Sequence, residues 1–97
     1  MWARVASFEG GDFERLRQMS EERMGSGTTG MPEGVRRVLV LADRDAGRRL
    51  FIAFFDSSEA IRAAEPRFEQ MGDEIPDDVR GRRTSVDVYE VAFDEPV

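Results

Sequence analysis

The sequence predicts an α+β protein of the ferredoxin-like class, with one four-stranded antiparallel sheet and two helices in the order β-α-β-β-α-β. Three observations lead to this prediction. Residues 36–61 contain a strand, a tight turn, a second strand and a helix start in immediate succession. A short strand followed by an amphipathic helix precedes this segment, and an apolar strand follows it. We therefore expect residues 1–97 to form one domain.

The first strand is expected over residues 2–8, and two glycines end it. Asp12 is suited to cap the following helix, because its carboxylate can accept hydrogen bonds from free backbone amides. Phe13, Leu16 and Met19 then recur at helical spacing. We expect these three side chains to form the buried face of the first helix.

The segment from Gly25 to Gly34 is expected to be a loop, because glycine, threonine and proline dominate it. Its glycines match the G-x-G-x-x-G pattern of dinucleotide-binding turns. That pattern binds phosphate where it lies between a strand and a helix N-terminus. Here it follows a helix and precedes a strand, so a loop without a nucleotide is our interpretation. A mobile flap over a pocket stays open as its role.

The central hairpin is expected to join strands at residues 35–42 and 50–55 through a turn at 43–47. Gly47 suits the left-handed backbone position that such turns need. The acidic residues of this turn, and those of segment 73–83, lack the full set of oxygen ligands that calcium requires. No metal site is therefore expected.

The second helix is expected to begin at residues 56–59, whose acids and hydroxyls suit the positive end of a helix. Its apolar face comprises Ala60, Ile61, Ala64, Phe68 and Met71. Pro66 should kink this helix or start a new turn near Glu65. A short helical turn at 76–79 and a last strand at 84–93 complete the pattern.

Right-handed crossovers predict the strand order four, one, three, two, with the first and third strands central. The third strand is apolar on both faces, with Leu50, Ile52 and Phe54 on one and Phe51, Ala53 and Phe55 on the other. Two helices cover only one face of such a sheet. Because a monomer would expose the other face, we expect a symmetric homodimer with sheet packed on sheet.

The composition excludes several classes of function. The chain has no cysteine and no histidine, which removes thiolate nucleophiles, the commonest general base and the usual haem ligand. A net charge of −6 disfavours non-specific binding to nucleic acid. No apolar run approaches the roughly 20 residues that span a bilayer, and no signal peptide is evident. A cytoplasmic protein without membrane contact is expected.

Four segments carry a resemblance to a known family: MWARV at 1–5, LADRDAGR at 41–48, FDSSEA at 55–60 and VYEVA at 88–92. They resemble the antibiotic biosynthesis monooxygenase-like proteins of the dimeric α/β-barrel superfamily. The resemblance implies the fold predicted above, a homodimer, and a pocket between the sheet and the helices of each protomer. Members of that family include cofactor-independent oxygenases of polyketide-like aromatics, haem-degrading enzymes and domains without an assigned reaction.

The chain departs from this family at the pocket. Members often have a tryptophan before the cap of the second helix, where this chain has Phe55. Active members commonly use asparagine or histidine in the pocket, and neither occurs here. Histidine-ligated haem degradation is thereby excluded, and no cofactor is expected. We expect a small-molecule-binding or accessory domain of unknown reaction, with a cofactor-independent monooxygenase of a polyketide-like aromatic as the alternative.

The alternation of side chains along a strand predicts which residues line the pocket. If Phe55 faces the helices, Phe51 does so too. A weak internal repeat between residues 8–12 and 55–59 places Phe8, Arg4 and Trp2 on the same face.

Arg4 is the residue of this set that an ordinary core does not explain, because a buried guanidinium needs a carboxylate or a ligand. Asp87 or Glu90 on the last strand is expected to supply the carboxylate, and anchoring of an anionic ligand is the other role considered. The candidate ligand-binding residues are Trp2, Arg4, Phe8, Phe51, Phe55 and Tyr89. The sequence identifies no catalytic residue.

Overall fold

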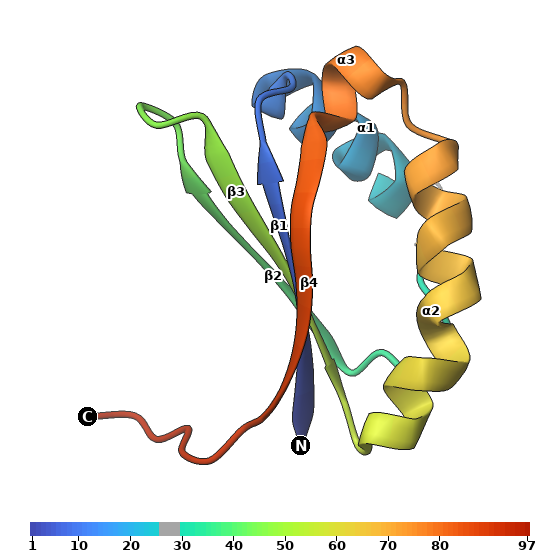
Figure 1. The fold of residues 1–97 in the computed structure, drawn as a ribbon, viewed down its shortest axis with the longest axis vertical. Helices are drawn as coiled ribbons and strands as arrows, with labels where there is room; N and C mark the ends of the chain where they lie inside the picture. The colour runs from blue at the N-terminus through green and yellow to red at the C-terminus, as the bar shows by residue number, and fades with distance from the viewer. Residues whose placement is uncertain (26–29) are drawn as a thin grey trace.

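The structure, a computed structural model, describes residues 1–25 and 30–97 of the chain (Figure 1). The strands are β1 (Trp2–Glu9), β2 (Arg37–Asp43), β3 (Arg48–Phe55) and β4 (Arg82–Glu90). The helices are α1 (Phe13–Gly25), α2 (Ser58–Asp73) and the single turn α3 (Asp77–Arg80). This order confirms the predicted ferredoxin-like α+β class, including the helical turn before the last strand. Part of the predicted loop between Gly25 and Gly34 lies outside the described residues.

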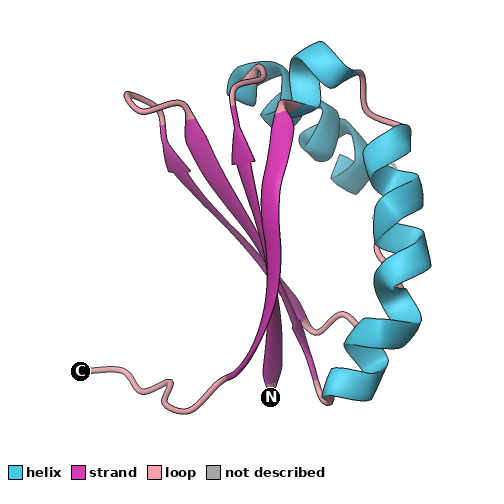
Figure 2. Ribbon diagram, in the orientation of Figure 1, coloured by secondary structure: helices cyan, strands magenta, loops and turns pink. Residues whose placement is uncertain are grey.

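The four strands form one antiparallel sheet in the order β2-β3-β1-β4. This is the predicted order, and it places β1 and β3 at the centre. All three helices lie on the same side of the sheet (Figure 2). The sheet therefore has a helix-facing side and an outer side, and the pairing register assigns each strand residue to one of them.

The core lies between α2 and the central strands. It comprises Ala53, Phe55, Ile61, Ala64, Phe68 and Met71. The rings of Phe55 and Phe68 meet edge to face at 6.1 Å between centroids. At the start of α2, the Ser57 hydroxyl accepts a hydrogen bond from the Ala60 amide at 3.1 Å. Phe55 thus faces the helices, as predicted.

The helix α2 continues through Pro66 as one element, without a second start near Glu65. The proline is exposed, whereas Ala64 and Phe68 on either side of it are buried in the core. The same apolar face is kept across the proline, so packing on the sheet holds the helix together where local propensity would interrupt it.

The helix α1 differs from its prediction. Asp12 caps it, since its Oδ1 atom accepts a hydrogen bond from the Arg15 amide at 3.0 Å. Phe13, Leu16 and Met19, however, are only half-buried and lie outside the core cluster. A backbone hydrogen bond of 2.9 Å from Asp12 to Val79 ties the start of α1 to α3. The apolar face of α1 therefore borders open space instead of packing flat on the sheet.

Two glycines allow β1 and β4 to converge near α3. Gly81 has a positive φ of 77°, and a Cβ atom there would lie 2.6 Å from the carbonyl oxygen of Glu9. Gly11, with φ of 84°, would bring a Cβ to 2.6 Å from the carbonyl oxygen of Val79. Only residues without a Cβ fit this junction.

The outer side of the sheet carries the second apolar face of β3. Leu50, Ile52 and Phe54 are half-buried there, and Leu41 of β2 is 47% exposed. None of the helices formed by the described residues covers this side (Figure 2). Within residues 1–25 and 30–97, none of the helices has the length and apolar character needed to cross a membrane.

Candidate functional site

A cavity of about 830 Å³ lies between the helix-facing side of the sheet and the helices. Strands β1, β2 and β3 and helices α1, α2 and α3 all contribute to its walls. The walls are largely apolar and include Phe8, Phe13, Leu16, Val40, Phe51 and Phe68. The half-buried face of α1 described above is one of these walls. The cavity thus lies where the family resemblance implied a pocket.

Arg4 lies on β1 at the inner wall and is 2% exposed. Its Nε and Nη2 atoms donate to the two carboxylate oxygens of Glu65 on α2, at 2.5 and 3.2 Å. The guanidinium also stacks over the ring of Phe68, at 4.1 Å from the centroid. This two-bond ion pair neutralises the buried charge.

The prediction that Asp87 or Glu90 pairs with Arg4 is therefore wrong. Asp87 lies opposite Val5 in the β1–β4 register, so its side chain is on the outer side of the sheet. Glu90 lies opposite Trp2, at the end of β4 and two residues along β1 from Arg4. The carboxylate comes from a helix instead, because α2 crosses the sheet directly over Arg4.

Arg49, on β3, is the other buried arginine, at 8% exposed. Its Nη2 atom donates to the carbonyl oxygen of Arg80 at 3.1 Å, and its guanidinium stacks over the ring of Phe8 at 4.4 Å. Burial lowers the pKa of Arg49, although an arginine keeps its proton at neutral pH. Among the described residues, no carboxylate forms an ion pair with it.

The remaining arginines of the cavity wall are neutralised by neighbours. Arg80 pairs with Asp77 at 2.8 Å, and Arg83 pairs with Glu69 at 2.7 Å. Arg17 pairs with two glutamates of its own helix. Within the described part of the chain, Arg49 is thus the wall arginine whose charge has no carboxylate partner.

The structure brings together three of the residues predicted from the sequence: Arg4, Phe8 and Phe51 line the cavity. Phe55 is fully buried in the core below it, and Trp2 packs against that core. Tyr89 lies opposite Ala3 on the outer side and is 56% exposed. Trp2, Phe55 and Tyr89 are therefore not brought into the cavity wall.

Arg49 was missed as a candidate. The signal was present, because Arg49 precedes Phe51 by two positions and so lies on the same side of β3. The adjacent Arg48 made the pair resemble solvated surface. Which of the two arginines is buried depends on the sheet register, where Arg49 lies opposite Phe8.

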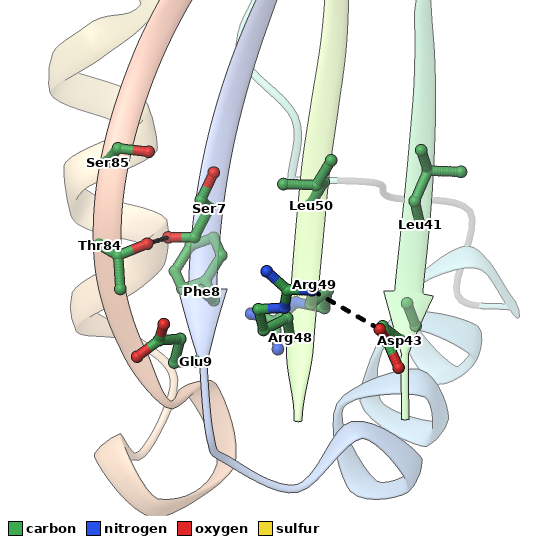
Figure 3. A pocket seen from close by; sticks show the side chains of 11 residues that line it. Ser7, Phe8, Glu9, Leu41, Asp43, Arg48, Arg49, Leu50, Thr84 and Ser85 are labelled. Atoms are coloured by element: carbon green, nitrogen blue, oxygen red, sulfur yellow. Dashed lines mark hydrogen bonds and ion pairs between the residues drawn. The ribbon is translucent and has the colours of Figure 1, made fainter. Parts of the chain in front are cut away.

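A second, smaller hollow of about 510 Å³ lies at the strand ends and borders Arg49 from the other side (Figure 3). Ser7, Ser85, Leu41 and Leu50 contribute to its wall. Two of its polar side chains have partners: Arg48 pairs with Asp43 at 3.8 Å, and the Thr84 hydroxyl donates to the Ser7 carbonyl at 3.3 Å. Among the described residues, no group of three or more carboxylate, histidine or cysteine side chains is placed to hold a metal ion.

The fold is similar to the crystal structure of a "putative antibiotic biosynthesis monooxygenase" from Deinococcus radiodurans. The TM-score is 0.54 at 15% sequence identity, and the alignment covers 100% of this chain and 98% of that chain. At this identity the similarity shows a shared fold, which supports the resemblance noted in the sequence. No protein-family model and no curated protein matches the chain.

Proposed function

We propose that this chain is a small-molecule-binding domain that takes an apolar or aromatic ligand into the cavity between sheet and helices. The cavity of about 830 Å³ is the observation that supports this function. Ligand sites in proteins are typically roughly 300–1,000 Å³, with mostly apolar walls and a few converging polar groups. Four phenylalanine rings and the guanidinium of Arg49 give this cavity that character.

We also propose that two copies associate through the outer sides of their sheets. Within the described part of one protomer, no helix covers the apolar side chains of β2 and β3 on that side. A symmetric dimer would bury them and leave both cavities on the outside of the sandwich.

The binding proposal is tested with N-phenyl-1-naphthylamine, a neutral aromatic probe whose fluorescence rises in apolar surroundings. We expect saturable binding, with amide chemical-shift changes concentrated in residues that line the cavity. Leu16→Trp fills part of the cavity and should weaken binding by about five-fold or more. Arg15→Trp places the same ring on the exposed side of α1 and serves as the matched control. Shift changes confined to the outer side of the sheet, or equal binding by both variants, would contradict the proposal.

A cofactor-independent monooxygenase is the second candidate function. The observation that favours it is a buried positive charge at Arg49 beside aromatic walls, an arrangement that stabilises an enolate or phenolate oxygen. In such a reaction the substrate carbanion supplies the electrons to O₂. One oxygen atom becomes a carbonyl in place of a CH₂ group, and the other leaves as water with the two hydrogens.

The test of this candidate is oxygen uptake with anthrone, followed by detection of anthraquinone. We expect one O₂ consumed for each anthraquinone formed, at a rate above that of anthrone in buffer. Leu16→Trp should reduce the rate and Arg15→Trp should not. A rate equal to the buffer rate would rule out this reaction for anthrone while leaving the binding function intact.

A further inference from the structure

We infer, resting on the binding function proposed above, that the ligand of this cavity is an organic anion, and that Arg49 binds its oxyanion. The proposed function specifies an apolar or aromatic molecule; the inference adds its charge and the residue that recognises it. Carboxylate, sulfonate and phenolate groups share the required chemistry.

Arg49 lacks the counter-charge that the other buried arginine has. Arg4 and Arg49 are the two buried charged residues of the described chain, and both lie on the helix-facing side of the sheet. Arg4 has Glu65 as a two-bond partner. Arg49 has only a carbonyl oxygen and the face of an aromatic ring. A buried charge without a counter-charge is costly. An anion in the cavity would neutralise the charge of Arg49, as Glu65 neutralises the charge of Arg4.

Arg49 also has hydrogen-bond donors available for a ligand. A guanidinium has five N–H donors, and the contact with the Arg80 carbonyl uses one nitrogen of Arg49. No fully buried side-chain nitrogen or oxygen of the described residues lacks a hydrogen-bond partner. The Arg49 nitrogens without a partner are therefore reached from the open space that Arg49 lines. They are free to form the parallel pair of hydrogen bonds that oxyanions accept from arginine.

The unpaired arginine charge of the cavity wall is concentrated at Arg49. Five arginines line the cavity, namely Arg4, Arg17, Arg49, Arg80 and Arg83, against the carboxylates of Glu69 and Asp73. Glu69 is engaged by Arg83, and Asp73 is exposed to solvent. Arg4, Arg17, Arg80 and Arg83 each have a carboxylate partner, so the arginine charge of the wall that is left without one is that of Arg49. This charge favours an anion over a neutral or cationic ligand.

The position of Arg49 also orients such a ligand. Phe8 lies under its guanidinium and Phe51 follows two positions along β3 on the same side. An oxyanion bound at Arg49 would direct an attached aromatic ring toward Phe51 and Phe68, which meet edge to face at 6.4 Å. Recognition would thus combine a charged contact with aromatic packing.

The experiment compares two probes that differ by one charged group. 1-Anilinonaphthalene-8-sulfonate carries the same ring system as N-phenyl-1-naphthylamine with an added sulfonate. We expect the wild-type protein to prefer the sulfonate, and Arg49→Met to lower the ratio of the two affinities by about ten-fold or more. Arg49→Lys keeps a charge and should retain part of the preference. Arg48→Met, at the exposed neighbouring position, should keep the full ratio.

The wild-type protein supplies a readout that does not depend on a folded variant. The Nε–H resonance of Arg49, assigned with Arg49→Lys, should shift on addition of the sulfonate and not of the neutral probe. An unchanged resonance, or a ratio that Arg49→Met leaves unaltered, would overturn the inference. Binding of the neutral probe without preference for the sulfonate would overturn the inference alone. Failure of both probes to enter the cavity would overturn the proposed function with it.

Discussion

Arg4 and Glu65 show how one residue pair positions a helix on a sheet. Arg4 is 2% exposed and Glu65 covers it from α2, so the pair joins the central strand to the helix that forms the core. The pair matters chiefly because each charge neutralises the other. Removing one partner of a buried ion pair lowers the stability of the fold by more than the intact pair adds to it.

Glu65→Gln should therefore destabilise the fold by about 2–3 kcal/mol, reduced from the value for a fully buried pair because Glu65 is partly exposed. The free energy of unfolding in urea measures this effect. Glu69→Gln removes the carboxylate from the exposed pair with Arg83 and should cost less than about 1 kcal/mol. Equal losses in the two variants would show that burial does not distinguish these pairs.

A second residue pair, Arg36 and Asp56, makes the pH response of one carboxylate measurable. A hydrogen bond from Arg36, at 2.6 Å, lowers the pKa of Asp56, and the charge of Arg36 adds to the effect. Because the folded pKa lies below the unfolded value, the pair stabilises the fold above the unfolded pKa. That contribution is lost as the pH falls through the folded pKa.

NMR titration of the Asp56 carboxyl should therefore give a pKa below that of an unperturbed aspartate, and Arg36→Gln should raise it. An Asp56 pKa that does not change in Arg36→Gln would show that the ion pair does not persist in solution.

At this scale the sequence identified Arg4 as needing a partner and did not identify the partner. The alternation of a strand fixes which neighbours share a face within the sheet. This alternation does not show which carboxylate of a helix lies over that face. Arg49 was missed for a related reason. Its burial depends on the pairing of β1 with β3, which places it opposite Phe8, a residue 41 positions earlier in the sequence.

At the scale of elements, the junction of β1, α3 and β4 depends on the absence of side chains. Gly81 combines a positive φ with a close backbone approach, since a Cβ atom added there would lie 2.6 Å from the carbonyl oxygens of Glu9 and Gly10. Backbone atoms at that distance have little room to give way. The junction fixes where α1 begins, and α1 forms one wall of the cavity.

Gly81→Ala should accordingly destabilise the protein by roughly 3 kcal/mol, measured by thermal or urea unfolding. Gly47→Ala is the control: Gly47 also has a positive φ, of 66°, but nothing lies within 4 Å of the added atom. Its cost should be about 1 kcal/mol, from backbone strain alone. A Gly81→Ala variant as stable as Gly47→Ala would mean that the strands separate easily at this end.

The elements themselves were largely predictable from local signals. Short apolar runs bounded by turn residues predicted the strands. Helical spacing, with Asp12 before one helix and residues 56–59 at the start of the other, predicted both long helices. The packing of α1 was not predictable, because the position of α1 depends on a backbone hydrogen bond to α3 that no local pattern shows. Pro66 shows the opposite case, in which packing of α2 overrides a local signal.

For the whole molecule, the uncovered outer side of the sheet is the feature that most needs a partner. Ile52 lies near its middle, on the central strand β3. Sedimentation at micromolar concentration should give a dimer for the wild-type protein and a monomer for Ile52→Glu, because the dimer would bury the new charge. Ala63→Glu adds the same charge on the exposed side of α2 and should remain dimeric. A monomeric wild-type protein would contradict the proposed dimer.

The strand order of the whole sheet followed from crossover handedness and was predicted correctly. The cavity size was not predictable, since it is the space that remains once three helices have packed on a twisted sheet. The family resemblance indicated where such a space lies and left its contents open.

The arginines of the cavity wall have a consequence for how any ligand would be studied. The chain contains none of the side chains that change charge between about pH 6 and 9, histidine and cysteine above all. Arginine keeps its proton throughout that interval. The cavity therefore presents a constant charge to whatever enters it. A binding affinity that varies with pH in this range would therefore report the ionisation of the ligand itself. The pH dependence of binding would give the pKa of an unknown ligand.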